Sequence, residues 1–202
     1  MTIASQVTAD PSDEALLVLY ANGDRHAALA LTRRITPRVM AYAARLLSGD
    51  RAEAEDVAQE TMLRLWRMAP DWRPGETRVT TWAYRVATNL CIDRQRSRQR
   101  RRQLALDEAP EMADASPGAE GRLQDADRMA ALTAALGELP DRQRQAVVLR
   151  HIEGLANPEI AAILEIGVEA VESLTARGKR ALSALLAGRK EDLGYEDDSD
   201  AG

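Results

Sequence analysis

The sequence is poor in the residues that build metal sites and disulfides. It contains one cysteine, Cys91, and two histidines, His26 and His151, which lie far apart along the chain. One cysteine cannot form an intrachain disulfide, and these three residues lack the spacing of a zinc or haem site, so we expect neither a metal nor a cofactor. Because a nucleophile paired with a base and a phosphate-binding glycine loop are also missing, we assign no catalytic residue and expect no enzyme.

Aromatic residues and long apolar runs are scarce too. Phenylalanine is absent, and aromatic residues make up 3% of the 202 residues. No apolar run reaches the roughly 18 residues that a membrane-spanning helix needs, and no leader pattern is found, so the chain is expected to be cytoplasmic without membrane insertion. Alanine, leucine, arginine and glutamate recur instead, which favours helices. The predicted fold class is all-α, with two small helical domains joined by a flexible linker.

The net charge of −5 conceals a segregation of charge along the chain. Within residues 94–102 six of nine residues are arginine, whereas residues 191–200 are almost all acidic or small. A basic segment of this kind suits nucleic acid, and a solvated helix end is the alternative interpretation.

Four helices are predicted in the first half of the chain. Helix caps and hydrophobic periodicity place them at 13–22, 24–48, 50–68 and from 81 into the arginine run, with a loop at 70–80. In the second of these helices we expect Leu29 to point inward and Pro37 to kink or split the helix.

The composition divides the whole chain into four parts. Residues 12–102 are predicted to form a first domain, because four helices of this length can bury a shared core. Residues 103–121 are predicted to be a flexible linker with few large apolar side chains. A second helical domain is expected over 122–188, followed by a disordered acidic tail over 189–202.

The second domain contains the pattern of a helix-turn-helix. A short helix over 158–164, a tight turn over 165–167 and a longer helix over 168–186 follow one another. On the longer helix Val171 and Gly178 belong to the packing side. The opposite side suits a major groove and consists of Glu169, Glu172, Ser173, Ala176, Arg177, Lys179 and Arg180. A structural helical hairpin is the alternative.

Two of these residues have the chemistry to read bases. Glu172 can accept a hydrogen bond from a cytosine amino group, and Arg177 can donate to guanine or to phosphate. Lys179 and Arg180 are expected to contact backbone phosphates.

One arc of the fourth predicted helix combines aromatic and polar side chains. An indole beside arginines and an amide suits bases and phosphates, which is the chemistry of single-strand capture. This arc consists of Trp82, Arg85, Asn89 and Arg96. The preceding loop has residues to line a pocket for an extruded base, namely Trp72, Arg73, Gly75 and Arg78. Alternatively, both tryptophans only anchor the core.

The third predicted helix is amphipathic with an acidic start. Its buried side is expected to consist of Val57, Ala58, Thr61, Leu65 and Met68. The outer side has the composition of a protein interface, with Asp56, Gln59, Glu60, Leu63, Trp66 and Arg67. In the alternative, Trp66 folds over a neighbouring helix.

Three segments in this order, 56–67, 81–90 and 139–144 with the helix-turn-helix after it, resemble bacterial sigma factors. The closest group is the extracytoplasmic-function (ECF) sigma factors of the sigma-70 family, which keep only the second and fourth sigma domains. The resemblance covers residues 12–188. It implies an alternative sigma factor that binds core RNA polymerase, promoter DNA and an anti-sigma factor, in transcription initiation under stress.

The resemblance also implies which surfaces bind polymerase and which bind promoter DNA. The acidic helix would dock on the β′ clamp helices of polymerase, through Asp56, Gln59, Glu60, Leu63 and Trp66. The melted −10 element would be captured by Trp72, Arg73, Arg78, Trp82, Arg85, Asn89 and Arg96, with Asn89 holding a flipped base. The second domain would lie on the β flap and place the exposed side of its longer helix in the −35 element.

This chain departs from the family pattern at the helix-helix turn. Glu165 and Gly167 stand where relatives often have glycine followed by serine or threonine. A non-glycine residue in a left-handed turn costs on the order of 1 kcal/mol. Position 172 is acidic where some relatives have arginine, so their −35 preference does not transfer to this chain.

The competing hypothesis is a stand-alone helix-turn-helix regulator, since similar second halves occur in response regulators. A receiver domain would alternate strands with helices, and the first half of this sequence shows no such alternation.

Overall fold

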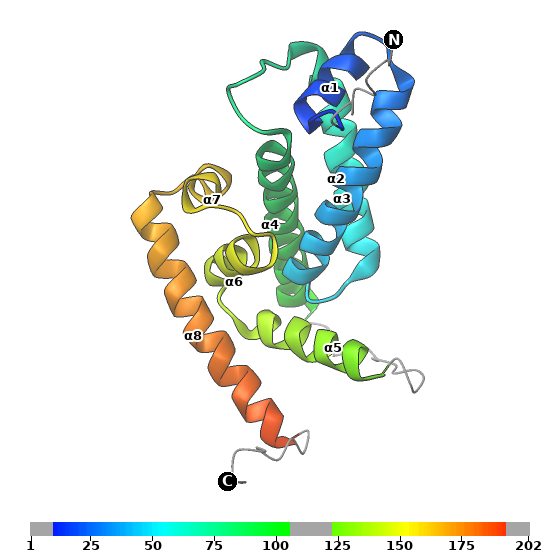
Figure 1. The fold of residues 1–202 in the computed structure, drawn as a ribbon. Coiled ribbons are helices and arrows are strands. Elements are labelled where there is room, and N and C mark those ends of the chain that lie inside the picture. The colour runs from blue at the N-terminus through cyan, green and yellow to red at the C-terminus, as the bar shows by residue number, and fades with distance from the viewer. Residues whose placement is uncertain (1–9, 106–122, 193–202) are drawn as a thin grey trace, which may run out of the picture.

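The computed structural model describes residues 10–105 and 123–192, and those residues form helices and connecting turns without any strand (Figure 1). This confirms the all-α prediction. The predicted flexible linker lies outside the described residues from 106 onward, and the acidic tail from 193 onward. Helix α8 extends to Asp192, and helix α4 extends to Ala105. The domain boundaries drawn from the sequence stay predictions.

The first half contains four α-helices, whose N-termini follow local capping chemistry. They are α1 (Asp13–Ala21), α2 (Arg25–Leu46), α3 (Arg51–Met68) and α4 (Val79–Ala105), with the short 3₁₀ turn η1 (Ala69–Asp71) after α3. Ser12, Asp24 and Asp50 cap the first three, each accepting a backbone N–H of the first turn. Helix α4 begins two residues earlier than the sequence predicted.

The structure corrects the expectation for Leu29 of α2 and excludes one of the two outcomes expected for Pro37, the split. Leu29 does not point inward, since its side chain is 50% exposed. Leu31, four residues before the buried Ile35, takes the inward position because residues i and i+4 share a helix face. Pro37 does not split α2, which remains one helix with the proline exposed.

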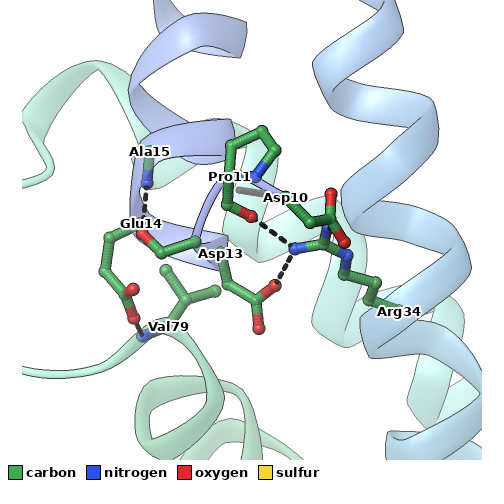
Figure 2. A network of polar contacts seen from close by, with 8 residues as sticks. Asp10, Pro11, Asp13, Glu14, Ala15, Arg34 and Val79 are labelled. Atoms are coloured by element: carbon green, nitrogen blue, oxygen red, sulfur yellow. Dashed lines mark hydrogen bonds and ion pairs between the residues drawn. The ribbon is translucent and has the colours of Figure 1, made fainter. Parts of the chain in front are cut away.

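Polar contacts tie α1 to its neighbours (Figure 2). Arg34 of α2 donates to the Pro11 carbonyl oxygen at 2.7 Å and to Asp13 Oδ1 at 3.1 Å, and it also pairs with Asp10. Glu14 accepts the backbone N–H of Val79 at 3.0 Å. The start of α4 is thereby attached to α1, although 65 residues separate them.

Two tyrosines are fully buried in the part of the hydrophobic core that the first half contributes. The rings of Tyr42 on α2 and Tyr84 on α4 meet edge to face, with centroids 5.1 Å apart. The Tyr42 hydroxyl lies 2.7 Å from the Thr88 hydroxyl, so this buried polar group is satisfied. Burial raises the pKa of Tyr42, whose hydroxyl therefore stays protonated.

The second half consists of α5 (Leu123–Glu138), α6 (Asp141–Val147), the π-helical turn η2 (Val148–Ile152), α7 (Asn157–Leu164) and α8 (Val168–Asp192). Pro140 separates α5 from α6. Helix α8 packs on α6 and α7. The described parts of both halves touch: α7 lies against α4, and α5 lies across the end of α2 (Figure 1).

Candidate nucleic-acid and protein interfaces

Helix α8 presents one polar side to solvent and packs the other. Val171 and Gly178 are buried, as the periodicity predicted. All seven residues predicted for the groove-facing side are exposed: Glu169, Glu172, Ser173, Ala176, Arg177, Lys179 and Arg180. This side is free to enter a major groove, because α8 packs on its neighbours through the opposite side, where Val171 and Gly178 are buried.

Hydrogen bonds to neighbouring side chains hold Arg177 and Glu172 on this polar side. The Arg177 guanidinium donates to the Ser173 hydroxyl at 2.7 Å, one turn earlier in the helix. The Asn157 amide, at the start of α7, donates to Glu172 Oε1 at 3.4 Å. The carboxylate and the guanidinium therefore extend from the same exposed surface.

The turn between α7 and α8 has the strained residue that the sequence predicted. Glu165 adopts a left-handed conformation with φ 55° and ψ 47°. The Ile166 N–H donates to the Ala161 carbonyl oxygen at 3.1 Å and closes α7. The helix-turn-helix forms despite the absence of glycine at this position.

The arc of α4 is partly exposed and partly packed. Arg85, Asn89 and Arg96 are exposed. Trp82 is half-buried and packs against the core, so its ring is both an anchor and a partly accessible surface. The opposite side, with Ala83 and Leu90, is buried.

The residues of the loop before α4 differ in exposure and in their partners. Trp72 is half-buried and packs against the core, and its buried Nε1 has no hydrogen-bond partner among the described residues. Arg73 lies 3.5 Å from Glu76 in an exposed ion pair. Arg78 donates to Glu159 of α7 at 3.1 Å, so a residue from the second half already binds it.

Helix α3 has the predicted division into two sides. Val57, Ala58, Thr61 and Leu65 are buried, while Met68 is half-buried. On the outer side Asp56, Gln59 and Arg67 are exposed, and Leu63 is 49% exposed.

Trp66 differs from its neighbours on the outer side of α3. Its ring lies 4.5 Å from the Tyr20 ring of α1, measured between centroids, and is half-buried. Trp66 therefore folds over a neighbouring helix, which was the alternative interpretation, while part of the ring stays accessible. Glu60 accepts from Arg64 at 2.8 Å, and this hydrogen bond lowers the pKa of the Glu60 carboxyl.

Comparison with known proteins identifies the family of this chain. The family model for Sigma-70 region 2 matches residues 31–101, and that for Sigma-70 region 4 matches residues 129–182. The chain belongs to the sigma-70 family. The sigma factor is 39% identical over 184 residues to ECF RNA polymerase sigma factor SigE of Mycolicibacterium smegmatis, covering 88% of this chain and 70% of the relative. It is 33% identical to RNA polymerase sigma factor NccH of Alcaligenes xylosoxydans xylosoxydans, covering 88% and 96%.

Solved structures resemble this sigma factor across both halves. CnrH in complex with the cytosolic domain of CnrY has a TM-score of 0.64 and 28% identity, covering 88% of this chain and 99% of that chain. The sigma factor RpoE of Bartonella quintana, in complex with the anti-sigma factor NepR, has a TM-score of 0.62 and 25% identity, covering 76% and 92%.

The family assignment settles which of the two hypotheses holds. The chain is an alternative sigma factor of the ECF group, which directs RNA polymerase to promoters. A stand-alone regulator is disfavoured because the region 2 match lies in the first half of the chain. Within the residues that the structure describes, no helix of the sigma factor is long and apolar enough to cross a membrane.

Sequence reasoning missed that part of the arginine run is structural. Arg94 pairs with Glu53 at 2.7 Å, and Arg98 pairs with Asp50 and with Glu53. These contacts attach α4 of the sigma factor to the start of α3, whereas Arg96 is exposed. The one available signal was the spacing of four residues between Arg94 and Arg98, which places both on one helix face.

Proposed function

We propose that this sigma factor binds core polymerase through the outer side of α3 and reads promoter DNA through α4 and α8. The observation that supports this division is the different chemistry of the three exposed surfaces. The surface of α3 combines acids with the half-exposed Leu63, which suits a protein partner and repels phosphates. The surfaces of α4 and α8 carry arginines and an amide, which suit nucleic acid.

The proposed polymerase contact uses Asp56, Gln59, Glu60, Leu63 and Trp66. By resemblance to the family, this surface docks on the β′ clamp helices, and the second domain docks on the β flap. Because Leu63 is 49% exposed one turn after the Glu60 carboxylate, we propose that it is the apolar anchor of the contact.

The proposed −10 contact uses Trp72, Arg73, Arg78, Trp82, Arg85, Asn89 and Arg96. Arg85, Asn89 and Arg96 are the exposed members on α4, so their side chains are accessible to the melted strand. We place Asn89 on a flipped base, since its amide can both donate to and accept from a base edge.

The proposed −35 contact uses Glu169, Glu172, Ser173, Ala176, Arg177, Lys179 and Arg180. Glu172 and Arg177 read base edges in the major groove, and Lys179 and Arg180 contact phosphates.

Transcription in vitro with purified core polymerase tests the proposal. The full chain is added to core enzyme with fragments of its own genome, and start sites are mapped. We expect specific starts that depend on the added chain. If the chain neither binds core enzyme nor starts transcription at any fragment, the proposed function is wrong.

We also propose an anti-sigma partner for this chain. Two similar structures support this, RpoE in complex with the anti-sigma factor NepR and CnrH in complex with the cytosolic domain of CnrY. On this proposal the chain acts in the cytoplasm as an initiation factor without catalysis of its own, and the partner covers the polymerase-binding surface. A pull-down from cells that carry a tagged chain, with and without inducing stress, measures this association.

A further inference from the structure

The residue directly before α4 cannot cap that helix. This residue is Arg78, whose side chain carries no oxygen and so cannot accept a backbone N–H. Helices α1, α2 and α3 are each preceded by a residue that does accept one, namely Ser12, Asp24 and Asp50. The N–H groups in the first turn of α4 therefore need an acceptor from another part of the chain or from solvent.

A carboxylate of α1 supplies this acceptor. Glu14 Oε1 accepts the backbone N–H of Val79, the first residue of α4, at 3.0 Å (Figure 2). Val79 is fully buried, so removal of the carboxylate would leave its N–H unpaired and shielded from water. The negative charge also lies at the N-terminal end of α4, where the helix dipole favours an anion. Glu14 thus caps a helix that begins 65 residues later.

Glu14 is itself held in place and charged. Arg34 of α2 donates to the Pro11 carbonyl oxygen and to Asp13, which fixes the backbone directly before Glu14. Desolvation acts to raise the pKa of the Glu14 carboxyl, but the hydrogen bonds that this carboxyl accepts lower its pKa below the ordinary value. Glu14 is therefore ionised at neutral pH.

Helix α1 contacts both ends of the loop that is proposed to capture the −10 element. It packs on η1, which ends at Asp71 before the loop, and on α4, which begins after the loop. Within the loop Trp72 packs against the core, whereas residues 73–78 are exposed. Because exposed residues have few packing contacts, the positions of the two ends determine how these residues are presented to DNA.

We infer that Glu14 is a positioning residue for −10 capture, because its cap fixes the junction between the loop and α4 from which the −10 residues extend. This inference rests on the proposed function, which assigns the loop and α4 to the −10 element. Glu14 acts through the backbone of α4 and needs no contact with DNA. Without the cap, the first turn of α4 opens more often, and the apparent affinity for the melted strand falls with the fraction of chains that keep the competent arrangement.

Amide hydrogen exchange of the full chain tests the cap without polymerase. We expect Glu14→Ala to speed exchange about fivefold at Val79, the usual size of a lost cap, and to leave the middle of α2 and α3 unchanged. The matched control is Glu55→Ala, which makes the same change at an exposed position of α3. An unchanged rate at Val79, or an equal rise in all helices of the first domain, would overturn the inference.

Binding of the melted strand tests the consequence for function. The full chain is assembled with core polymerase, and the probe is a single-stranded oligonucleotide with the −10 element of a promoter mapped with the unmodified chain. We expect Glu14→Ala to bind this probe about fivefold more weakly, with unchanged affinity for core polymerase and for a duplex −35 probe. Native affinity of Glu14→Ala for the −10 probe would overturn the inference. If the unmodified chain starts no transcription, the proposed function itself fails.

Two milder variants separate the hydrogen bond from the charge and serve if Glu14→Ala does not fold. Glu14→Gln keeps an oxygen at the same reach, so we expect it to bind the −10 probe within about twofold of the unmodified chain. Glu14→Asp keeps the charge but is one carbon shorter, so we expect a loss of about fivefold. The reverse order, or native binding by both variants, would overturn the inference. Equal losses of −10 binding and core binding would make Glu14 a structural residue only.

Discussion

Gly178 of α8 passes so close to α6 that a Cβ atom at this position would lie 2.5 Å from Val147 Cγ2. The same atom would lie 3.2 Å from the backbone oxygen of Gln143. Only a glycine lets α8 cross α6 at this separation, and the crossing fixes the polar side of α8 outward.

Replacement of Gly178 should therefore destabilise the second domain. We expect Gly178→Ala to lower the free energy of unfolding by about 1 to 3 kcal/mol, the usual cost of overpacking, despite the better helix propensity of alanine. Thermal and urea unfolding measure the change. The control is Gly167→Ala, where an added Cβ meets nothing within 4 Å. A loss at Gly178 no larger than that at Gly167 would contradict the close crossing.

The Asp50 carboxylate joins the start of α3 to α4 and should give an acid-sensitive contribution to stability. The backbone N–H of Glu53 and the Arg98 guanidinium hold the pKa of this carboxyl below its ordinary value. Because the pKa of Asp50 is lower in the folded chain, its ionised carboxylate stabilises the fold at pH values above the unfolded pKa of about 3.9. This stabilisation is lost as the pH falls through the folded-state pKa. Asn also caps helices, so Asp50→Asn removes mainly the charge.

The test of Asp50 compares the variant with the natural chain at two pH values. We expect Asp50→Asn to be less stable at pH 7 by no more than about 1 kcal/mol, because the pair is about a third exposed and screened. The difference should shrink below about pH 4. The exposed Asp93, replaced by asparagine, is the control. A stability difference that stays constant down to pH 2 would argue against the ion pair.

The outer side of α3 offers a matched test of polymerase binding. We expect Asp56→Ala with Leu63→Ala to weaken core binding at least about tenfold, because interface anchors cost about 2 kcal/mol or more when truncated. Leu29→Ala is the control, since Leu29 and Leu63 are exposed to the same extent, 50% and 49%. Binding is measured by competition for core enzyme. Unchanged affinity for the double variant would remove this surface from the proposed contact.

Trp66 requires a separate variant because it also packs on Tyr20. We expect Asp56→Ala with Trp66→Ala to weaken core binding and also to lower the melting temperature of the first domain, while the second domain stays folded. Circular dichroism accompanies the binding assay to separate the two effects. A loss of binding proportional to the unfolded fraction would make Trp66 a structural residue only.

Replacement of Glu172 should alter which −35 sequence is preferred rather than the overall affinity for DNA. We expect Glu172→Ala to change the ranking of −35 sequences by about 1 to 3 kcal/mol at one base pair, as for other direct base contacts. Lys179→Ala should weaken binding evenly across sequences and reduce its salt dependence. Selection from a randomised −35 library measures both. An unaltered ranking for Glu172→Ala would make this carboxylate a bystander.

The amino-acid sequence by itself determined those features that depend on neighbours within about one helical turn. Ser12, Asp24 and Asp50 cap their helices because a side-chain oxygen reaches an N–H two or three residues later. The buried and exposed sides of α3 and α8 follow from the 3.6-residue period. The left-handed Glu165 was also visible, because the turn requires this conformation whichever residue occupies it.

Only the tertiary structure decided the contacts between residues far apart in the chain. Trp66 lies on Tyr20, Arg98 pairs with Asp50, and Glu153 is bound by Tyr84 across 69 residues. No periodicity encodes such pairs, because each depends on how whole helices pack and on which buried polar groups must find a partner. The sequence therefore predicted the exposed sides of α3 and α8 in this sigma factor, whereas the packing of α7 on α4 and of α5 and α6 on α2 decided that its two halves meet.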